Sequence, residues 1–255
     1  MRRSLLALLA LLATPAFAAD IGISPPRLDL TAGPGETVNA TVTVLTSAGG
    51  DQQVAAELAD WTLDLRGSLT SLPPGSVAHA ATAWLELDAD EFTLGPRASR
   101  EVRIAVAVPA DAELAGTYHT MVFFTVVPSP VDARGVGVVT TTRVGLTVYV
   151  TVAGTERAGS ELVDLYQADD RTIIAVVLNT GNTVMRLGGE IQLRDEAGAV
   201  RHTLEVPDVP VLRESERELT FELPDDLEPG FYVALALIQD SRGGVLAGEL
   251  PLEVP

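Results

Sequence analysis

The sequence predicts an all-β fold made of two tandem immunoglobulin-like β-sandwiches. One reason is a pattern that occurs in residues 99–126 and again in residues 214–238. In each copy an alternating strand ends at a proline, an acidic turn follows, and Gly-x-Tyr opens a second apolar strand. The other reason is that apolar residues after residue 20 recur with a period of two, or in short runs between Gly, Pro, Asp and Asn. No window keeps a helical period of 3.6, so we expect minimal helix.

The tyrosines of the repeated pattern, Tyr118 and Tyr232, carry the sandwich assignment. In immunoglobulin-like domains a tyrosine near the start of the penultimate strand packs its ring in the core and bonds its hydroxyl to the upstream backbone. Each copy therefore predicts one sandwich.

The first eighteen residues have the pattern of a cleaved signal peptide. Arg2 and Arg3 precede an apolar run over residues 4–13, and residues 16–18 form a small–x–small cleavage site. The run is shorter than the roughly twenty residues that span a hydrocarbon core. We expect a mature chain starting near Ala19, without a membrane span, in the periplasm or at the cell surface.

The remaining chain divides into two units of ordinary domain size. We expect an N-terminal sandwich over residues 19–153, a small and polar linker over residues 154–160, and a C-terminal sandwich over residues 161–255. One irregularity lies near Asp60, where the apolar parity of residues 54–58 gives way to the opposite parity at Trp61. That change predicts a β-bulge or a strand that changes sheets.

Charge and composition exclude several classes of function. All 17 basic residues are arginine, against 35 acidic residues, and without Arg2 and Arg3 the net charge is −20. Such a surface repels nucleic acid and anionic lipid. The absence of lysine rules out a Schiff-base lysine or a P-loop lysine. The absence of cysteine rules out thiol catalysis and disulfides.

No group of residues predicts catalysis. The three histidines, His79, His119 and His202, lie far apart in the sequence, and His119 is expected at a surface or half-buried position. Motifs for metalloproteases, nucleophile elbows, phosphate loops or dinucleotide binding do not occur. Without cysteine and with scattered histidines, no metal site is expected. We interpret the chain as non-enzymatic, with no cofactor.

An ordered set of short motifs in the first domain resembles the PapD-like periplasmic chaperones, which are two immunoglobulin-like sandwiches that assist pilus or fimbria subunits. The resemblance covers roughly residues 20–152, and the second domain matches only in general immunoglobulin-like character. The motifs are Ile-Ser-Pro-Pro-Arg-Leu-Asp-Leu at 23–30, Trp-Leu-Glu-Leu at 84–87, Phe-Thr-Leu at 92–94, Val-Ala-Val-Pro at 106–109 and Gly-Thr-Tyr at 116–118.

The resemblance implies that the protein lends a strand to a partner that lacks one. The matching segment is 144–152, preceded by the loop 129–142, which in the family continues the donor strand. Its alternating apolar residues would face the partner, and the alternative is that all of them face the core of their own domain. The candidate partner-binding residues on this strand are Val144, Leu146, Val148 and Val150.

The resemblance also implies that a partner's C-terminal carboxylate is held by an arginine on the first strand and a lysine on the donor strand. Arg27 is at a plausible first-strand position, and a guanidinium suits a carboxylate. A structural salt bridge is the alternative role for Arg27. This chain has no lysine, and Arg143, which begins the candidate donor strand, does not align with it.

Three functions remain open on the sequence. The first is a chaperone or assembly factor for a secreted β-rich subunit, possibly pilus-like. The second is a structural envelope module that binds peptidoglycan or a neighbouring wall protein, because the N-terminal half also resembles cell-wall-associated immunoglobulin-like domains. The third and weakest is an accessory carbohydrate-binding sandwich.

Overall fold

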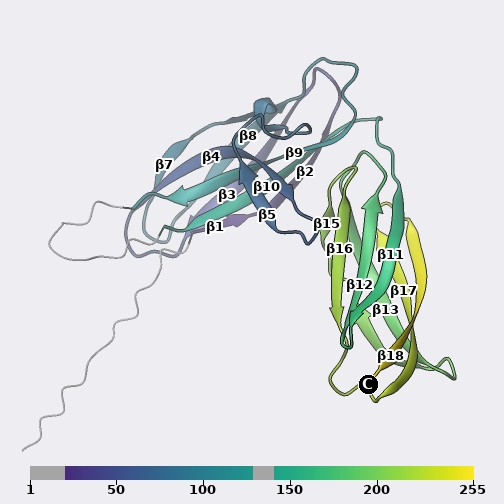
Figure 1. Ribbon diagram of the computed structural model, residues 1–255. Helices are drawn as coiled ribbons and strands as arrows, with labels where there is room; N and C mark the ends of the chain where they lie inside the picture. Colours follow the sequence, from purple (N-terminus) through teal and green to yellow (C-terminus); the bar gives the residue numbers. More distant parts are fainter. Residues whose placement is uncertain (1–20, 129–140) are drawn as a thin grey trace, which may run out of the picture.

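The chain forms two β-sandwiches joined end to end (Figure 1). The structure is a computed structural model, and it describes residues 21–128 and 141–255. The expected signal peptide, 1–18, lies outside the described residues, as does most of the loop 129–142. Strands make up the described fold, apart from one 3₁₀ turn at Thr82–Trp84. The prediction of an all-β protein with two tandem sandwiches is confirmed.

The first sandwich packs a four-stranded sheet, in the order β1-β3-β8-β6, against a six-stranded sheet, in the order β2-β10-β9-β4-β5 with β7 also paired to β4. The strands are β1 (Ile21–Ser24), β2 (Arg27–Ala32), β3 (Thr37–Thr46), β4 (Gln52–Leu63), β5 (Leu69–Leu72), β6 (Leu85–Leu87), β7 (Glu91–Leu94), β8 (Ser99–Ala107), β9 (Gly116–Val126) and β10 (Arg143–Val152).

The second sandwich packs a three-stranded sheet, in the order β11-β12-β16, against a five-stranded sheet, in the order β14-β13-β17-β18 with β15 also paired to β13. The strands are β11 (Ser160–Asp169), β12 (Thr172–Asn179), β13 (Met185–Asp195), β14 (Val200–Glu205), β15 (Pro210–Val211), β16 (Glu216–Glu222), β17 (Gly230–Asp240) and β18 (Val245–Val254). The boundaries at residues 153 and 161 stay predictions.

Each sandwich has its own apolar core, as alternating strands require. The first core includes Val42, Ile104, Phe124 and Leu146, and the second includes Ile173, Ile191, Phe221 and Ile238. Both cores are rich in aliphatic residues, whose burial stabilises a sandwich that has no cysteine for disulfides.

The first strand of the chain is divided between the two sheets of the first sandwich. β1 pairs antiparallel with β3 in the four-stranded sheet, whereas β2 pairs parallel with β10 in the six-stranded sheet. The crossing is at Pro25-Pro26, where neither residue has an N–H to donate to a ladder.

Of the two alternatives for the segment near Asp60, the β-bulge is wrong, and β4 instead changes its partner there, pairing with β9 up to Ala59 and with β5 from Asp60. β4 runs from Gln52 to Leu63 with no shift in register against β9 or β5. The side chain of Trp61 lies on the outer face of the sheet, where it packs with Met121, Tyr149 and Leu212. The apolar parity changes because the second sandwich covers the outer face there, and the backbone itself stays regular.

The two copies of the tyrosine pattern differ in one bond. The hydroxyl of Tyr232 donates a 2.8 Å hydrogen bond to the carbonyl oxygen of Glu228, as expected for a tyrosine corner. Tyr118 packs its ring on Trp84, with 4.4 Å between centroids, and its hydroxyl has no such bond to the described backbone. Both rings are half-buried against their cores.

The sandwiches contact each other through main chain and side chains. The β4–β5 hairpin reaches β16 (Figure 1), where Glu218 N donates to the carbonyl oxygen of Leu65 at 2.7 Å. The guanidinium of Arg213 donates to Ala115 O at 2.7 Å. The turn at 179–182 binds the linker, where Arg157 N donates to Asn182 Oδ1 at 2.7 Å. These contacts hold a cleft between the two sandwiches.

Candidate functional site

The candidate site is centred on an edge of β10 along which β2 pairs with only part of the strand. β2 pairs with β10 from Thr147 to Val152, and its ladder begins where Thr147 N donates to Pro26 O at 3.2 Å. On this side, Arg143–Leu146 has no strand partner within 21–128 and 141–255. The cause is the crossing at Pro25-Pro26, which carries the preceding chain into the other sheet.

The open edge exposes main-chain groups in a strand conformation. Adjacent residues of a strand direct their N–H and C=O groups to opposite sides. Because Thr147 N bonds β2 and Thr142 O accepts from Val126 of β9, odd-numbered residues face the open side. The N–H and C=O groups of Arg143 and Gly145 are therefore directed at the open edge. Unpaired strand edges of this kind are templates for an added strand.

The alternating apolar residues of β10 lie in the core of their own sandwich. Leu146, Val148 and Val150 are each 0% exposed, and Val144 is half-buried against the same core. The structure thus places these side chains in the core of their own domain, which is the alternative to their facing a partner. Among these four apolar residues, only Val144 is both at the open edge and partly exposed.

Arg143 lies on the outer face of the same strand. Its guanidinium carbon is 3.4 Å from the ring centroid of Phe123, and its NH2 is 3.6 Å from Glu57 Oε2. The neighbouring Gly145 has no side chain, and a Cβ there would lie 2.8 Å from Met121 Sδ. Arg143 is therefore held on the sheet surface beside the open edge. Arg27 pairs with Thr147 at the start of the β2 ladder, where the open edge ends.

Arg27 lines a cleft of about 300 Å³ between the two sandwiches. Arg186 and Arg242 of the second sandwich line the same cleft, together with Tyr149 and Thr151 of β10. Arginines from three separate elements thus line one cleft together with Asp29, and only Arg27 among these arginines was predicted from the sequence. The other two were missed because they belong to a domain that matched no family motif.

Two of these arginines have carboxylate partners. Arg27 Nε is 2.7 Å from Asp29 Oδ2, and Arg186 Nε is 2.5 Å from Asp208 Oδ1. The hydrogen bond from Arg186 holds the pKa of Asp208 below its usual range. No side-chain ion pair of Arg242 is found in the part of the chain that the structure describes. Burial raises the pKa of Tyr149 to about 12, so this hydroxyl stays protonated as a hydrogen-bond donor.

A buried polar network lies in the first sandwich around Asp60, and the sequence did not reveal it. The carboxylate of Asp60 accepts hydrogen bonds from Ser76 N at 2.7 Å and Val77 N at 3.0 Å, and from Thr82 Oγ1 at 2.5 Å. Thr82 Oγ1 is also 2.7 Å from Thr120 Oγ1. Because these bonds satisfy a fully buried carboxylate, we assign Asp60 a structural role.

The position expected for His119 is wrong. His119 is 3% exposed, its Nε2 donates to Trp61 O at 3.0 Å, and its amide nitrogen donates to His79 O at 2.9 Å. Burial lowers the pKa of the His119 imidazole. The side chain shares the outer-face parity of Trp61, which the second sandwich covers.

Within residues 21–128 and 141–255, no group of three or more His, Cys, Asp or Glu side chains could hold a metal ion. Among the same residues there is also no helix with the length and apolarity of a membrane span.

The fold and the cleft define a protein with two immunoglobulin-like sandwiches, an open strand edge and an interdomain cleft lined by three arginines and Asp29. Solved structures with a similar fold include the Escherichia coli chaperone DraB, at 13% identity and a TM-score of 0.48, covering 93% of this chain and 96% of that one. Another is the class 5 fimbriae chaperone CfaA, at 12% identity and a TM-score of 0.49, covering 92% of this chain and 99% of that one.

The fold is also similar to a chain of the CsuC–CsuE chaperone–tip subunit pre-assembly complex of Acinetobacter baumannii, at 11% identity and a TM-score of 0.49, covering 92% of this chain and 98% of that one. No protein-family model matches the sequence, and no curated protein matches it.

Proposed function

We propose that the protein is an exported, non-enzymatic chaperone or assembly factor that binds a β-rich, pilus-like subunit by strand addition. The observation that carries this proposal is the open edge of β10 at Arg143–Leu146. The pilus-like nature of the client follows the PapD-like motifs of the first domain. The periplasm is the proposed compartment.

Strand addition at this edge uses main-chain hydrogen bonds for affinity. The N–H and C=O groups of Arg143 and Gly145 pair with the incoming strand, which continues the line of β2 beyond Pro26. Val144 adds an apolar contact at the same edge, while Leu146, Val148 and Val150 keep the strand firmly in its own core. The core of the first sandwich therefore holds β10 rigidly in place, and the open edge of β10 binds the client.

The cleft extends the same site by binding a carboxylate. Arg27 is available for a bidentate pair with a chain terminus, as the family resemblance implies. Where the family has a lysine on the donor strand, this chain has none. Arg186 and Arg242 line the cleft from the second sandwich. Arg186 is paired with Asp208, so Arg242 supplies the positive charge in place of the lysine.

The test compares Arg143→Pro with Arg143→Ala. Both variants remove the side chain and its contacts with Phe123 and Glu57, but only proline removes an N–H from the open edge. The mature chain is co-expressed in the periplasm with a secreted β-rich subunit encoded beside it, and the complex is isolated by size exclusion. We expect Arg143→Ala to retain the subunit and Arg143→Pro to lose it.

Hydrogen exchange supplies an independent readout. In the complex, the amides of Arg143 and Gly145 should become protected, because strand addition pairs them. A complex in which both amides exchange as fast as in the free chain would refute strand addition at this edge. If the exported protein acquires no subunit and remains with the cell wall, the envelope-module function replaces the proposal.

A further inference from the structure

β17 is apolar on both of its faces, although only one face belongs to a core. Ala234, Ala236 and Ile238 point into the second core and are each 0% exposed. The alternate residues point outward, and none of them belongs to the core of the second sandwich. These outward residues are Phe231, Val233, Leu235 and Leu237, here called the β17 stripe.

Cross-strand pairing defines the surroundings of the β17 stripe, since residues directly opposite in a ladder share a face. On β18, Phe231 lies opposite Glu253, and Leu235 lies opposite Glu249. On β13, Leu237 lies opposite Glu190, and Val233 lies opposite Arg194, whose guanidinium bonds Gln192 Oε1, so that carboxylates outnumber cations beside the stripe. An antiparallel sheet normally presents alternating polar residues to water, so this apolar column is a departure that marks an interaction surface.

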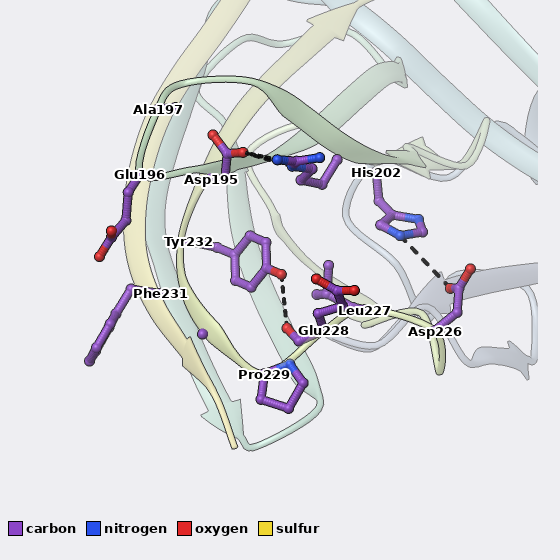
Figure 2. A pocket seen from close by; sticks show the side chains of 12 residues that line it. Asp195, Glu196, Ala197, His202, Asp226, Leu227, Glu228, Pro229, Phe231 and Tyr232 are labelled. Atoms are coloured by element: carbon purple, nitrogen blue, oxygen red, sulfur yellow. Dashed lines mark hydrogen bonds and ion pairs between the residues drawn. The ribbon is translucent and has the colours of Figure 1, made fainter.

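The stripe ends in a groove at the distal end of the second sandwich. Phe231 is 61% exposed and projects away from Tyr232, to the same side as Glu196 (Figure 2). The groove beside it has a volume of about 450 Å³, with Val233, Pro251 and Leu252 among its lining residues. An exposed aromatic ring over an apolar groove has the shape of a docking position for another side chain.

The charges around the groove select the occupant. Glu196 and Glu253 line it, and neither forms an ion pair among the described residues. Their charges add to the net −20 of the mature chain. A second copy of this protein or an anionic membrane would be repelled, whereas a cationic segment would be attracted.

We propose that the β17 stripe and its groove bind an extended, cationic peptide segment of a protein partner, with apolar side chains at its centre and lysine or arginine at its ends. The apolar centre packs on Phe231, Val233 and Leu235. One cationic end pairs with Glu196 and Glu253 beside Phe231, and the other pairs with Glu249 opposite Leu235. This surface lies on the second sandwich, so it is separate from the client edge on β10 and independent of the proposed function.

The experiment titrates the mature protein into a fluorescein-labelled peptide, Lys-Lys-Val-Phe-Val-Lys-Lys, and follows fluorescence anisotropy. We expect saturable binding that weakens with salt. Phe231→Ala should weaken binding about tenfold or more, as expected for a central aromatic contact. The control Val163→Ala removes a residue that is 50% exposed on β11, in the other sheet, and should leave the affinity unchanged.

Charge selection is tested with the same peptide carrying glutamate in place of each lysine, which should not bind. The proposal is overturned if the lysine peptide does not bind, if Phe231→Ala binds it as well as the parent, or if both peptides bind equally. It is also overturned if Phe231→Ala dissociates a dimer in sedimentation, or abolishes binding to phosphatidylcholine vesicles, because a second copy or a lipid surface is then the occupant.

Discussion

The amide nitrogen of Thr117 in the first sandwich donates a 2.9 Å hydrogen bond to the carbonyl oxygen of Asn182 in the second. The preceding residue, Gly116, makes this approach possible. Its φ is +77°, and a Cβ on it would lie 2.1 Å from the same Asn182 oxygen. The two sandwiches are thus joined at a point where only glycine fits.

Gly116→Ala is therefore predicted to loosen the interface and to lower the free energy of unfolding. The matched control is Gly75→Ala, where φ is +83° and an added Cβ meets nothing within 4 Å. The control should cost about 1 kcal/mol from backbone strain alone. Gly116→Ala should cost about 3 kcal/mol, measured by urea denaturation, and equal losses in the two variants would show that the close approach to Asn182 is not maintained.

Tyr232→Phe and Tyr118→Phe separate the two tyrosine positions. Tyr232→Phe removes the hydroxyl that bonds Glu228 O and should cost about 1 kcal/mol. Tyr118→Phe keeps the ring contact with Trp84 and should change stability by less than about 0.5 kcal/mol. Thermal denaturation of both variants measures these losses of stability. A larger loss of stability in Tyr118→Phe than in Tyr232→Phe would contradict the prediction.

Leu146→Glu should unfold the first sandwich, because it places a carboxylate where the side chain is 0% exposed. The expected cost is about 4 kcal/mol or more. Val144→Glu, at a half-buried position on the same strand, should remain folded. Circular dichroism on heating compares the two. A native melting temperature for Leu146→Glu would mean that this residue leaves the core, as a donor side chain would.

Stability should fall as the pH is lowered from about 7 to 5. Burial lowers the folded-state pKa of His119, and burial together with Arg213 lowers that of His79. The unfolded chain therefore binds more protons below about 6.5, and acid favours unfolding. Protonation of His119 would also place an N–H at its buried Nδ1, which has no partner among the described groups.

His119→Gln should reduce this pH dependence while keeping an amide donor for Trp61 O. Urea midpoints at pH 5, 6 and 7 give the slopes. Equal slopes in His119→Gln and the parent would remove His119 as the cause.

The sequence predicted the sandwiches through local patterns, and it failed where one sandwich covers another. The parity of Trp61 suggested a bulge, and His119 was expected near the surface, because an outer sheet face is normally in water. Both side chains are buried: Trp61 packs against Leu212 of the second sandwich, and His119 lies beside Trp61. Burial between domains leaves no periodic signal, since it depends on residues such as Leu212 that lie far along the chain.

The candidate site, too, could be predicted from the sequence only in part. The sequence identified β10 and Arg27 from motifs, but alternation alone left two roles open for the apolar residues of the strand. Only the pairing of β2 from Thr147 onward reveals that Arg143 and Gly145 have an open side. Only the packing of the sandwiches brings Arg186 and Arg242 to the cleft beside Arg27.

By itself, the sequence determined the all-β class and the tandem plan, because alternation, prolines and glycines act over a few neighbouring residues. The choice of β10 as the partner-binding strand stays a prediction. The tertiary structure decided which edge is free, which face is covered and which charges meet. Those properties arise from contacts between segments distant in sequence, whose register and docking no local pattern specifies.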